Sequence, residues 1–234
     1  EDFEQLRAYV LSLGMKAPHP QHLTPSDYNT IIKQTKDSNY SSSLSMTMLR
    51  SFKQAQYQAD NIGHFGLALK NYTHFTSPIR RYPDLLVHRA IRHIITKKKL
   101  GEYCYTNKDM HEFGDICSER ERRAEKATRD VDAILKCQYM EDKVGLSFKG
   151  TVTSITNFGL FVQLDDTLIE GLIHVSTLKN DYYLYDERSL SLVGERNKII
   201  YNIGDRLEIK VNEVDLSMRR INFSLMRKVS KDDK

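Results

Sequence analysis

The sequence predicts an α+β protein, in which a mainly helical block is followed by a five-stranded β-barrel of the OB type. Up to about residue 144, apolar residues recur at the three- and four-residue spacing of amphipathic helices. From Leu146 onward, β-branched and aromatic residues alternate with polar ones, which is typical of strands. We therefore expect one unit over residues 1–144, a barrel over 145–228 and a polar tail over 229–234.

Five helices are expected in the first unit, each with its apolar residues on one face. Gly14 is a typical helix stop, and Thr24 followed by Pro25 is a typical helix start. The expected helices span 1–13, 24 onward, 44 to about 59 (with Leu44, Met48, Phe52 and Ala55 on one face), 78–98 and 110–143. The segment "HFGLAL" is expected to form a strand, and residues 17–25 and 37–43 to form connecting loops.

Five strands are expected in the barrel, separated by turn residues such as Asn157, Asp166 and Gly204. They are "FKGTVTSI", "GLFVQL", "IEGLIHV", "RLEIKVNEV" and "RINFSL". Leu160 and Phe161 must point to opposite faces of their strand, so one of them leaves the core. An aromatic side chain on the open face of an OB barrel can stack bases. The alternative, in which Phe158 and Phe161 are both core residues, stays open at this point.

Positive charge is concentrated between His64 and Leu100. This segment holds eight Lys or Arg residues and a single acid, Asp84, for a net charge of +7, although the whole chain carries only +4. Such a block favours binding of a polyanion. A solvated helix face is the other interpretation, and it suits the run "KKK" better than the whole block, in which aromatic residues and prolines interleave with the charges.

Two adjacent arginines in this block stand at an expected helix start. Ser77 would be the N-cap and Pro78 the first helical residue, so the helix mouth would present backbone N–H groups to a phosphate. Arg80 would face Asp84 one turn later, provided that the break imposed by Pro83 preserves that register. The planar guanidinium suits phosphate oxygens, so a phosphodiester ligand would explain the arginines.

Several classes of protein are disfavoured by composition. No apolar run approaches the length of a membrane span, and no signal peptide is visible. The chain begins with Glu1, which suggests a piece of a longer protein. The three cysteines lack zinc or redox spacing and are expected to be buried or idle thiols in a reducing cytosol. His19 and His22 flank prolines in a connector, and we expect no metal site there.

The segment "GTVTSITNFGLFVQLDDTLIEGLIHVSTL" resembles the RNA-binding domain of the ribosomal-protein-S-one type, with its G-x-V, FG-x-FV and GL-x-H-x-S motifs. The resemblance covers residues 146 to about 226. It implies RNA-facing residues at Phe158, Phe161, His174, Asp215 and Arg220, with Arg219 as an alternative to Arg220. Residues 180–205 form a long insert, whose Tyr182, Tyr183 and Tyr185 would either add stacking surface or pack internally.

The stretch "HFGLALKNYTHFTSPIRRYPDLLVH" resembles the signature of the ribonuclease II/ribonuclease R family without a gap. The segments around it, "MLRSFKQAQY" and "ERRAEKATRDVDAILKC", resemble the ribonuclease R branch. The resemblance implies that residues 1–144 are the C-terminal portion of the ribonuclease II-type catalytic domain and that the barrel binds RNA.

The family implies processive hydrolysis of RNA from its 3′ end to nucleoside 5′-monophosphates, assisted by Mg²⁺. Arg80 would be the catalytic arginine that stabilises charge on the scissile phosphate, and Arg81 would attract or position RNA. The metal-binding aspartates of the family have no counterpart here, so we expect no metal ligand in this chain, which would bind RNA without degrading it. The expected partner is RNA with a single-stranded 3′ end, in the cytoplasm, with no membrane and no obligate protein partner.

Two alternatives remain. The chain could be a non-catalytic module that binds single-stranded RNA, an interpretation that leaves only the "TSPIRRY" block unexplained. It could also be an adaptor that docks a partner along its long helix, in which case nucleic-acid binding should depend weakly on salt.

Overall fold

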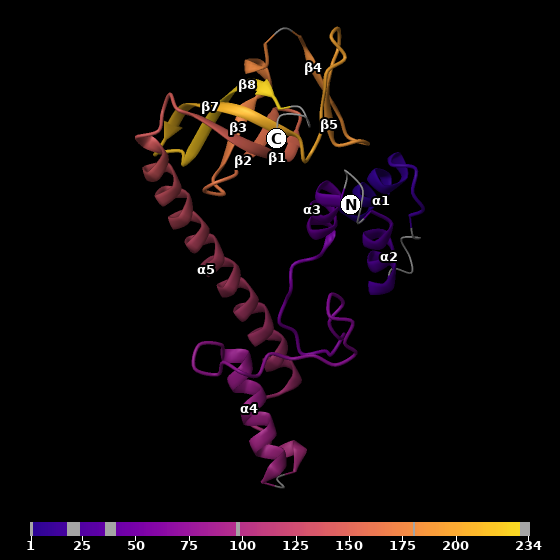
Figure 1. Ribbon diagram of the computed structural model, residues 1–234. Helices are drawn as coiled ribbons and strands as arrows, with labels where there is room; N and C mark the ends of the chain where they lie inside the picture. The colour runs from indigo at the N-terminus through magenta and orange to yellow at the C-terminus, as the bar shows by residue number, and fades with distance from the viewer. Residues whose placement is uncertain (1, 18–23, 36–40, 97–98, 180, 230–234) are drawn as a thin grey trace. The chain divides into compact units, whose positions relative to one another are not determined.

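The computed structural model describes residues 2–17, 24–35, 41–96, 99–179 and 181–229 (Figure 1). The expected connector at 17–25, including His19 and His22, and the first part of the expected loop at 37–43 therefore lie largely outside the described residues. The chain divides into two compact units, one made of residues 1–52 and 130–234 and the other of residues 53–129.

The first unit begins with three short helices around a small apolar core. They are α1 (Asp2–Ser12), α2 (Pro25–Thr35) and α3 (Ser41–Ser51). As expected, Gly14 follows α1 with a positive φ of 74°, and α2 starts at Pro25, where the Asp27 carboxylate accepts bonds from Thr24 N and Oγ1, both at 2.7 Å. The buried core residues are Leu6, Tyr9, Val10, Tyr28, Ile31, Leu44 and Met48.

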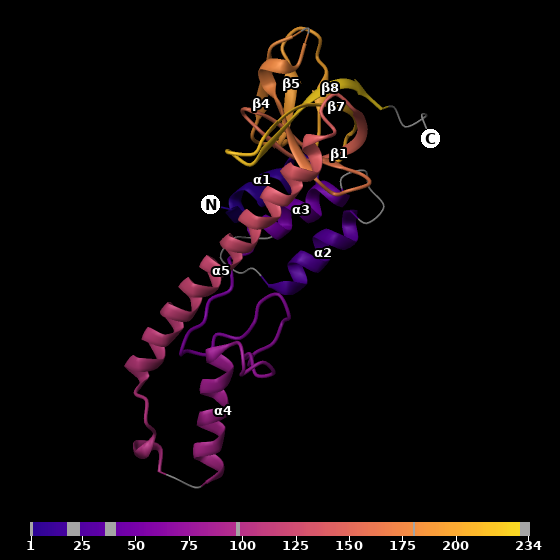
Figure 2. The same ribbon diagram turned by 90° about the vertical axis from the view of Figure 1, so that its left-hand side faces the viewer.

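The barrel is closed, in the order β1-β2-β3-β8-β7 (Figures 1 and 2). Its strands are β1 (Ser147–Thr156), β2 (Gly159–Leu164), β3 (Glu170–His174), β7 (Arg206–Asp215) and β8 (Arg220–Lys228). Neighbours pair antiparallel except β3 and β8, which pair in parallel through Leu172 and Asn222. All five expected strands are present, and the α+β class with a five-stranded OB barrel is confirmed.

The barrel core extends onto the end of the long helix. This helix, α5, spans Asn107–Glu141 and was expected over 110–143. In the first unit its last turns bury Cys137 and Met140 in the same apolar cluster as the barrel residues Leu160, Val162 and Phe223. The helix end therefore caps the barrel core.

The insert between β3 and β7 is a separate three-stranded sheet, preceded by a 3₁₀ turn, η3 (Val175–Thr177). Its strands are β4 (Tyr183–Asp186), β5 (Ser191–Gly194) and β6 (Ile200–Tyr201). The open question about its tyrosines is answered residue by residue: Tyr183 is buried, Tyr185 packs partly buried against the barrel core, and Tyr182 is exposed.

The insert and the barrel also contact the three short helices. Leu190, in the turn between β4 and β5, packs against the core of α1–α3. Arg50 of α3 donates a hydrogen bond from Nη1 to Ser154 Oγ of β1 at 3.0 Å. Helices, barrel and insert thus form one packed unit.

The second unit contains a long irregular segment, then α4 (Tyr82–Ile95), the 3₁₀ turn η2 (Leu100–Glu102) and the first part of α5. Two expectations were wrong, one for α3 of the first unit and one for the irregular segment of the second. Helix α3 starts at Ser41, inside the expected loop, and stops at Ser51, so Ala55 lies outside it. The segment "HFGLAL" forms a turn with one bridge between His64 and Leu69 instead of a strand.

Tertiary contacts explain why residues after Lys53 leave the helical path. Tyr57 N donates a hydrogen bond to Ser118 Oγ of α5 at 2.9 Å. A Cβ at Gly114 would lie 2.7 Å from Tyr57 O, so the backbone approaches the helix where it has no side chain. The turn at 64–69 places Ala68 at a φ of 55°, which no regular strand accommodates.

Candidate nucleic-acid interface

The basic pair of the second unit stands on a closed turn before α4, not inside a helix. The amides of Arg80 and Arg81 both point to Ser77 O, at 3.2 and 2.9 Å. Helix α4 begins at Tyr82 with Arg81 as its N-cap residue, so the expectation of Ser77 as N-cap and Pro78 as first helical residue was wrong. Pro83 has no N–H to continue the ladder toward Ile79, and the helical bonds start afresh with Leu85 N to Arg81 O at 3.3 Å.

Asp84 is the fixed point of this turn. Its side chain is completely buried, and Oδ2 accepts bonds from Ser77 N at 2.8 Å and from Arg81 Nη2 at 2.9 Å. The expected partner was Arg80; that expectation was wrong, because the break at Pro83 changes the register. Burial acts to raise the pKa of Asp84, but the bond from Ser77 and the bond and charge of Arg81 outweigh it and hold the pKa below its usual value.

Arg80 differs from its neighbour. It is exposed, and its side chain has no hydrogen bond or ion pair among the described residues, whereas the Arg81 side chain is only 21% exposed. Ile79 beside it is fully exposed. The turn therefore presents one free guanidinium, and a phosphate group is a ligand that its planar fork fits.

Aromatic and histidine side chains support the segment that leads into the turn. Tyr57 Oη lies 3.1 Å from His74 Nδ1, and the pKa of Tyr57 is raised to about 12 by burial and by the hydrogen bond and charge of Glu121. His88 of α4 lies 2.9 Å from Phe75 O through Nε2 and stacks on the Phe75 ring at 4.2 Å. The contacts of His88 hold the segment before the turn to α4.

The barrel carries an aromatic face on β1–β3. Phe158 lies in the turn before β2, Phe161 on β2, and His174 at the end of β3, where it pairs with Gly159. The two phenylalanine rings meet edge to face at 5.8 Å. Leu160 is buried while Phe161 is half-buried and Phe158 is 44% exposed, so the alternative in which both phenylalanines are core residues is not what the structure shows.

Gly159 makes this arrangement possible, since a Cβ there would clash with the carbonyl oxygen of Ile173. His174 is held by its neighbour: Nδ1 lies 2.7 Å from Ser176 Oγ. Its imidazole stays exposed beside the phenylalanine pair. The three side chains are thus positioned by adjacent strands of one sheet.

Asp215 and Arg220 face each other across the hairpin of β7 and β8. Asp215 accepts bonds from Ser217 Oγ at 2.6 Å and Met218 N at 2.9 Å, which lower its pKa. Arg219 sits in the turn at a φ of 53° and pairs with Asp130 of α5 at 3.6 Å. Among the described residues, no side-chain hydrogen bond, ion pair or ring contact joins this hairpin pair to the aromatic face.

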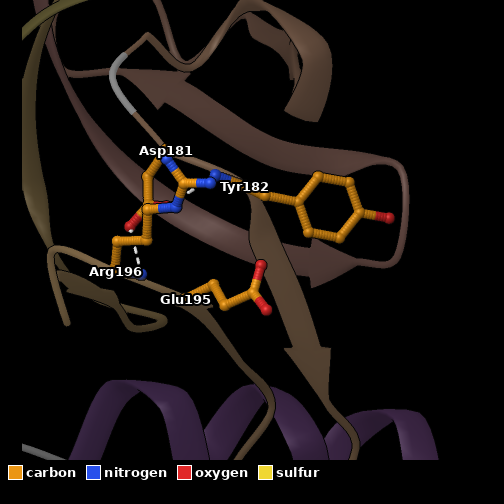
Figure 3. Close-up of a pocket in the computed structure, with 4 residues that line it drawn as sticks. All are labelled: Asp181, Tyr182, Glu195 and Arg196. Atoms are coloured by element: carbon orange, nitrogen blue, oxygen red, sulfur yellow. Dashed lines mark hydrogen bonds between the residues drawn. The ribbon is translucent and has the colours of Figure 1, made fainter.

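A shallow hollow of about 390 Å³ lies in the insert, lined by Asp181, Tyr182, Glu195 and Arg196 (Figure 3). Asp181 Oδ2 accepts bonds from Arg196 N and Asn197 N, at 2.8 and 2.6 Å, and so holds the turn after β5. The Tyr182 ring points away from the Arg196 guanidinium (Figure 3). Two acids and one base line it, so the hollow does not extend the basic surface.

Among the described residues, no three His, Cys, Asp or Glu side chains gather as a metal-binding group. Asp165, in a barrel turn, is paired with Arg206 at 2.6 Å. The thiols of Cys104, Cys117 and Cys137 are all free. In the described part of the chain, no helix combines the length and apolarity needed to cross a membrane.

Comparison with known proteins places these features in a family. The model of the RNB domain matches residues 1–97, and that of the S1 RNA binding domain matches residues 141–226. Ribonuclease R of Escherichia coli is 45% identical over 97% of this chain, and that of Vibrio cholerae is 47% identical over 94%. The chain belongs to the ribonuclease II/ribonuclease R family.

The structural match agrees. The apo form of Mycoplasma genitalium RNase R covers 96% of this chain with a TM-score of 0.83 and 27% identity, and this chain covers 36% of it. The chain spans 29% of the length of Escherichia coli ribonuclease R and 28% of that of Vibrio cholerae. The turn with Arg80 lies in the part of the chain that the RNB domain matches, and the aromatic face lies in the part that the S1 RNA binding domain matches. Ribonuclease R is thus the relative with which both features are compared.

One residue of the turn was given the wrong partner from the sequence. Asp84 was treated as a partner for Arg80, not as a buried anchor of the turn. A signal was present, since Asp84 is the one acid between His64 and Leu100. A single carboxylate in an otherwise basic segment, one residue after a proline, is expected to form an ion pair or hydrogen bond that holds the local backbone.

Proposed function

We propose that this chain is the C-terminal region of a 3′-to-5′ exoribonuclease, which hydrolyses RNA processively to nucleoside 5′-monophosphates. The observation that carries the proposal is the free guanidinium of Arg80 on the turn before α4, in a chain that also carries an RNA-binding barrel. We also propose that the portion of the catalytic domain ends at residue 144 and that the RNA-binding barrel spans residues 145–228.

RNA would be held by the barrel and guided by the basic block. Phe158, Phe161 and His174 offer exposed ring surface on adjacent strands, which suits stacking of single-stranded bases. Arg220, with Asp215 opposite it, would contact the backbone or a base at the second hairpin. An RNase R of Mycoplasma genitalium has been solved in complex with ribose-methylated single-stranded RNA, and single-stranded 3′ ends are the partner we propose.

In the hydrolysis, Arg80 would hold charge on the scissile phosphate, because a preorganised guanidinium stabilises negative charge that develops in the transition state. Arg81 would add positive charge to the RNA path. The family implies a divalent metal, which we propose to be Mg²⁺. The described residues do not fit such an ion, since no three of their candidate ligands gather. Its ligands would lie outside this chain, and no step here is routed through it.

The test compares this chain with a longer protein that contains the whole catalytic domain. Both are incubated with Mg²⁺ and end-labelled RNA that carries a free 3′ end. We expect the chain alone to bind RNA without releasing mononucleotides, and the longer protein to release them processively. Chelator-sensitive release by the chain alone would show that its own carboxylates form the metal site. Binding without degradation by both proteins would favour the non-catalytic RNA-binding module.

We place the protein in the cytoplasm with no obligate protein partner, as a proposal supported by its three free thiols. Fractionation of cells that carry a tagged copy tests the location. Recovery with the membrane or in a stable heteromeric complex would contradict it.

A further inference from the structure

We propose that Asp84 is a positioning residue for the arginine pair: it clamps Arg81 and the Ser77 turn, so that Arg80 alone is free to meet a phosphate. This inference rests on the proposed function for its kinetic consequence, but not for its structural one. The two can therefore be tested apart.

The clamp consists of two bonds to one oxygen. Asp84 Oδ2 takes the Ser77 amide at 2.8 Å and the Arg81 guanidinium at 2.9 Å. The other end of Ser77 is fixed as well, since its carbonyl oxygen accepts the amides of Arg80 and Arg81. The backbone on both sides of Arg80 is thereby tied to the first turn of α4.

Burial and charge separate the two arginines. A carboxylate that is completely buried needs a cation beside it, and Arg81 supplies that charge. Arg81 therefore has less charge to offer a ligand, while Arg80 has no such partner among the described residues. The adjacent cations do not act as an interchangeable pair.

The clamp is not an optimal device for stability. Asp84 Oδ1 and Arg81 Nε are buried without a hydrogen-bond partner among the described residues. An unpaired buried polar atom is unfavourable, and breaking a buried pair leaves an uncompensated charge. A buried acid kept at this cost is better explained by the geometry it imposes on the turn than by stabilisation of the helix.

The first experiment uses this chain without RNA. An arginine-selective dicarbonyl reagent is added, and fragment-ion mass spectrometry follows the modification of Arg80 and Arg81 separately. We expect Arg80 to react at least tenfold faster than Arg81, and Asp84→Asn to bring the two rates within about threefold. Asp109→Asn is the matched control, because Asp109 accepts the same kind of bonds from Thr106 N and Oγ1 at the start of α5 but is only partly buried, whereas Asp84 is completely buried. It should leave the rates unchanged.

The second experiment measures single-turnover RNA cleavage in the longer protein. Asp84→Asn is expected to lower the rate at saturating RNA at least tenfold with little change in affinity. Combined with Arg80→Ala it should add almost nothing, because Asp84 acts through Arg80. Arg81→Lys keeps the buried charge pair and should lose less rate than Arg80→Lys, which keeps a point charge but not the fork. This comparison remains informative if Asp84→Asn folds poorly.

The outcomes are distinguishable. Equal reactivity of both arginines in the unaltered chain, or full additivity of Asp84→Asn and Arg80→Ala, would overturn the clamp. A longer protein that binds but never cleaves RNA would overturn the proposed function, while the modification pattern would still decide for or against the clamp.

Discussion

Asp84 Oδ2 lies 2.9 Å from Arg81 Nη2, while Arg80, four residues before Asp84, remains exposed. The (i, i+3) contact has replaced the (i, i+4) contact that a continuous helix would give. This single change of register decides which arginine is available to a ligand.

Replacing Arg80 should slow RNA cleavage without weakening RNA binding. In the longer protein, Arg80→Ala should raise the activation free energy of cleavage by several kcal/mol, by analogy with the loss of an oxyanion donor. It should change RNA affinity little. Arg80→Lys should rescue poorly. Rapid-quench cleavage and equilibrium binding measure the two effects. Arg92→Ala, which removes another exposed charge of the basic block, is the control and should weaken RNA binding without slowing cleavage at saturating RNA. An affinity loss alone for Arg80→Ala would remove its catalytic assignment.

Replacing Phe161 should weaken RNA binding by the barrel. Phe161→Ala should cost about 1–3 kcal/mol of binding free energy, the range for loss of one stacked base. Fluorescence anisotropy with a short single-stranded RNA is measured together with the thermal unfolding curve. Tyr182→Ala, an exposed aromatic on the insert, should leave affinity unchanged. Lower stability with unaltered affinity of the folded protein would identify Phe161 as a packing residue.

Salt should weaken RNA binding by this chain in a graded way. Each phosphate neutralised on a single strand contributes roughly −0.7 to the slope of log K against log salt. Three or four contacts, supplied by the basic block and the barrel, would give a slope of about −2 to −3. Titrations between low and moderate salt measure this slope. A slope near zero would favour the adaptor, which docks a protein along the long helix.

Acid should destabilise the turn through Asp84. Its pKa in the folded chain lies below the ordinary 3.8, so the folded state releases the proton more readily than the unfolded state. The stabilisation is therefore complete above about pH 5 and is lost as the pH falls through the folded pKa. Denaturant unfolding at several pH values, followed by a probe in α4, should show a flatter acid dependence for Asp84→Asn. An unchanged pH profile would mean that Asp84 does not contribute this linkage.

The parts of the fold that follow local periodicity could be predicted from sequence. The barrel strands alternate with period two and are bounded by turn residues, so their positions, and the opposite orientation of Leu160 and Phe161, follow from local pattern. The pattern did not decide which of the two leaves the core; in the structure Leu160 is buried and Phe161 is half-buried. Helix α5 has a long amphipathic stripe and no proline.

Other features depend on contacts between distant residues. After Lys53 the backbone at Tyr57 packs against Ser118 and Gly114 of α5, and no local sequence pattern predicts those contacts. Pro83 indicated a break at the start of α4 but not which arginine Asp84 would contact. That partner is decided by the burial of Asp84 beside Arg81. The small sheet of the insert had no recognisable alternation because its strands are as short as two residues.

The packing of Leu190 into α1–α3, together with the bond from Arg50 to Ser154, gives the insert a mechanical consequence. An RNA strand drawn across the aromatic face would pull on β1 to β3, and that load would pass through the insert and Arg50 into the three short helices. The barrel would then resist the pull together with the insert and the three short helices, and would not move independently of them.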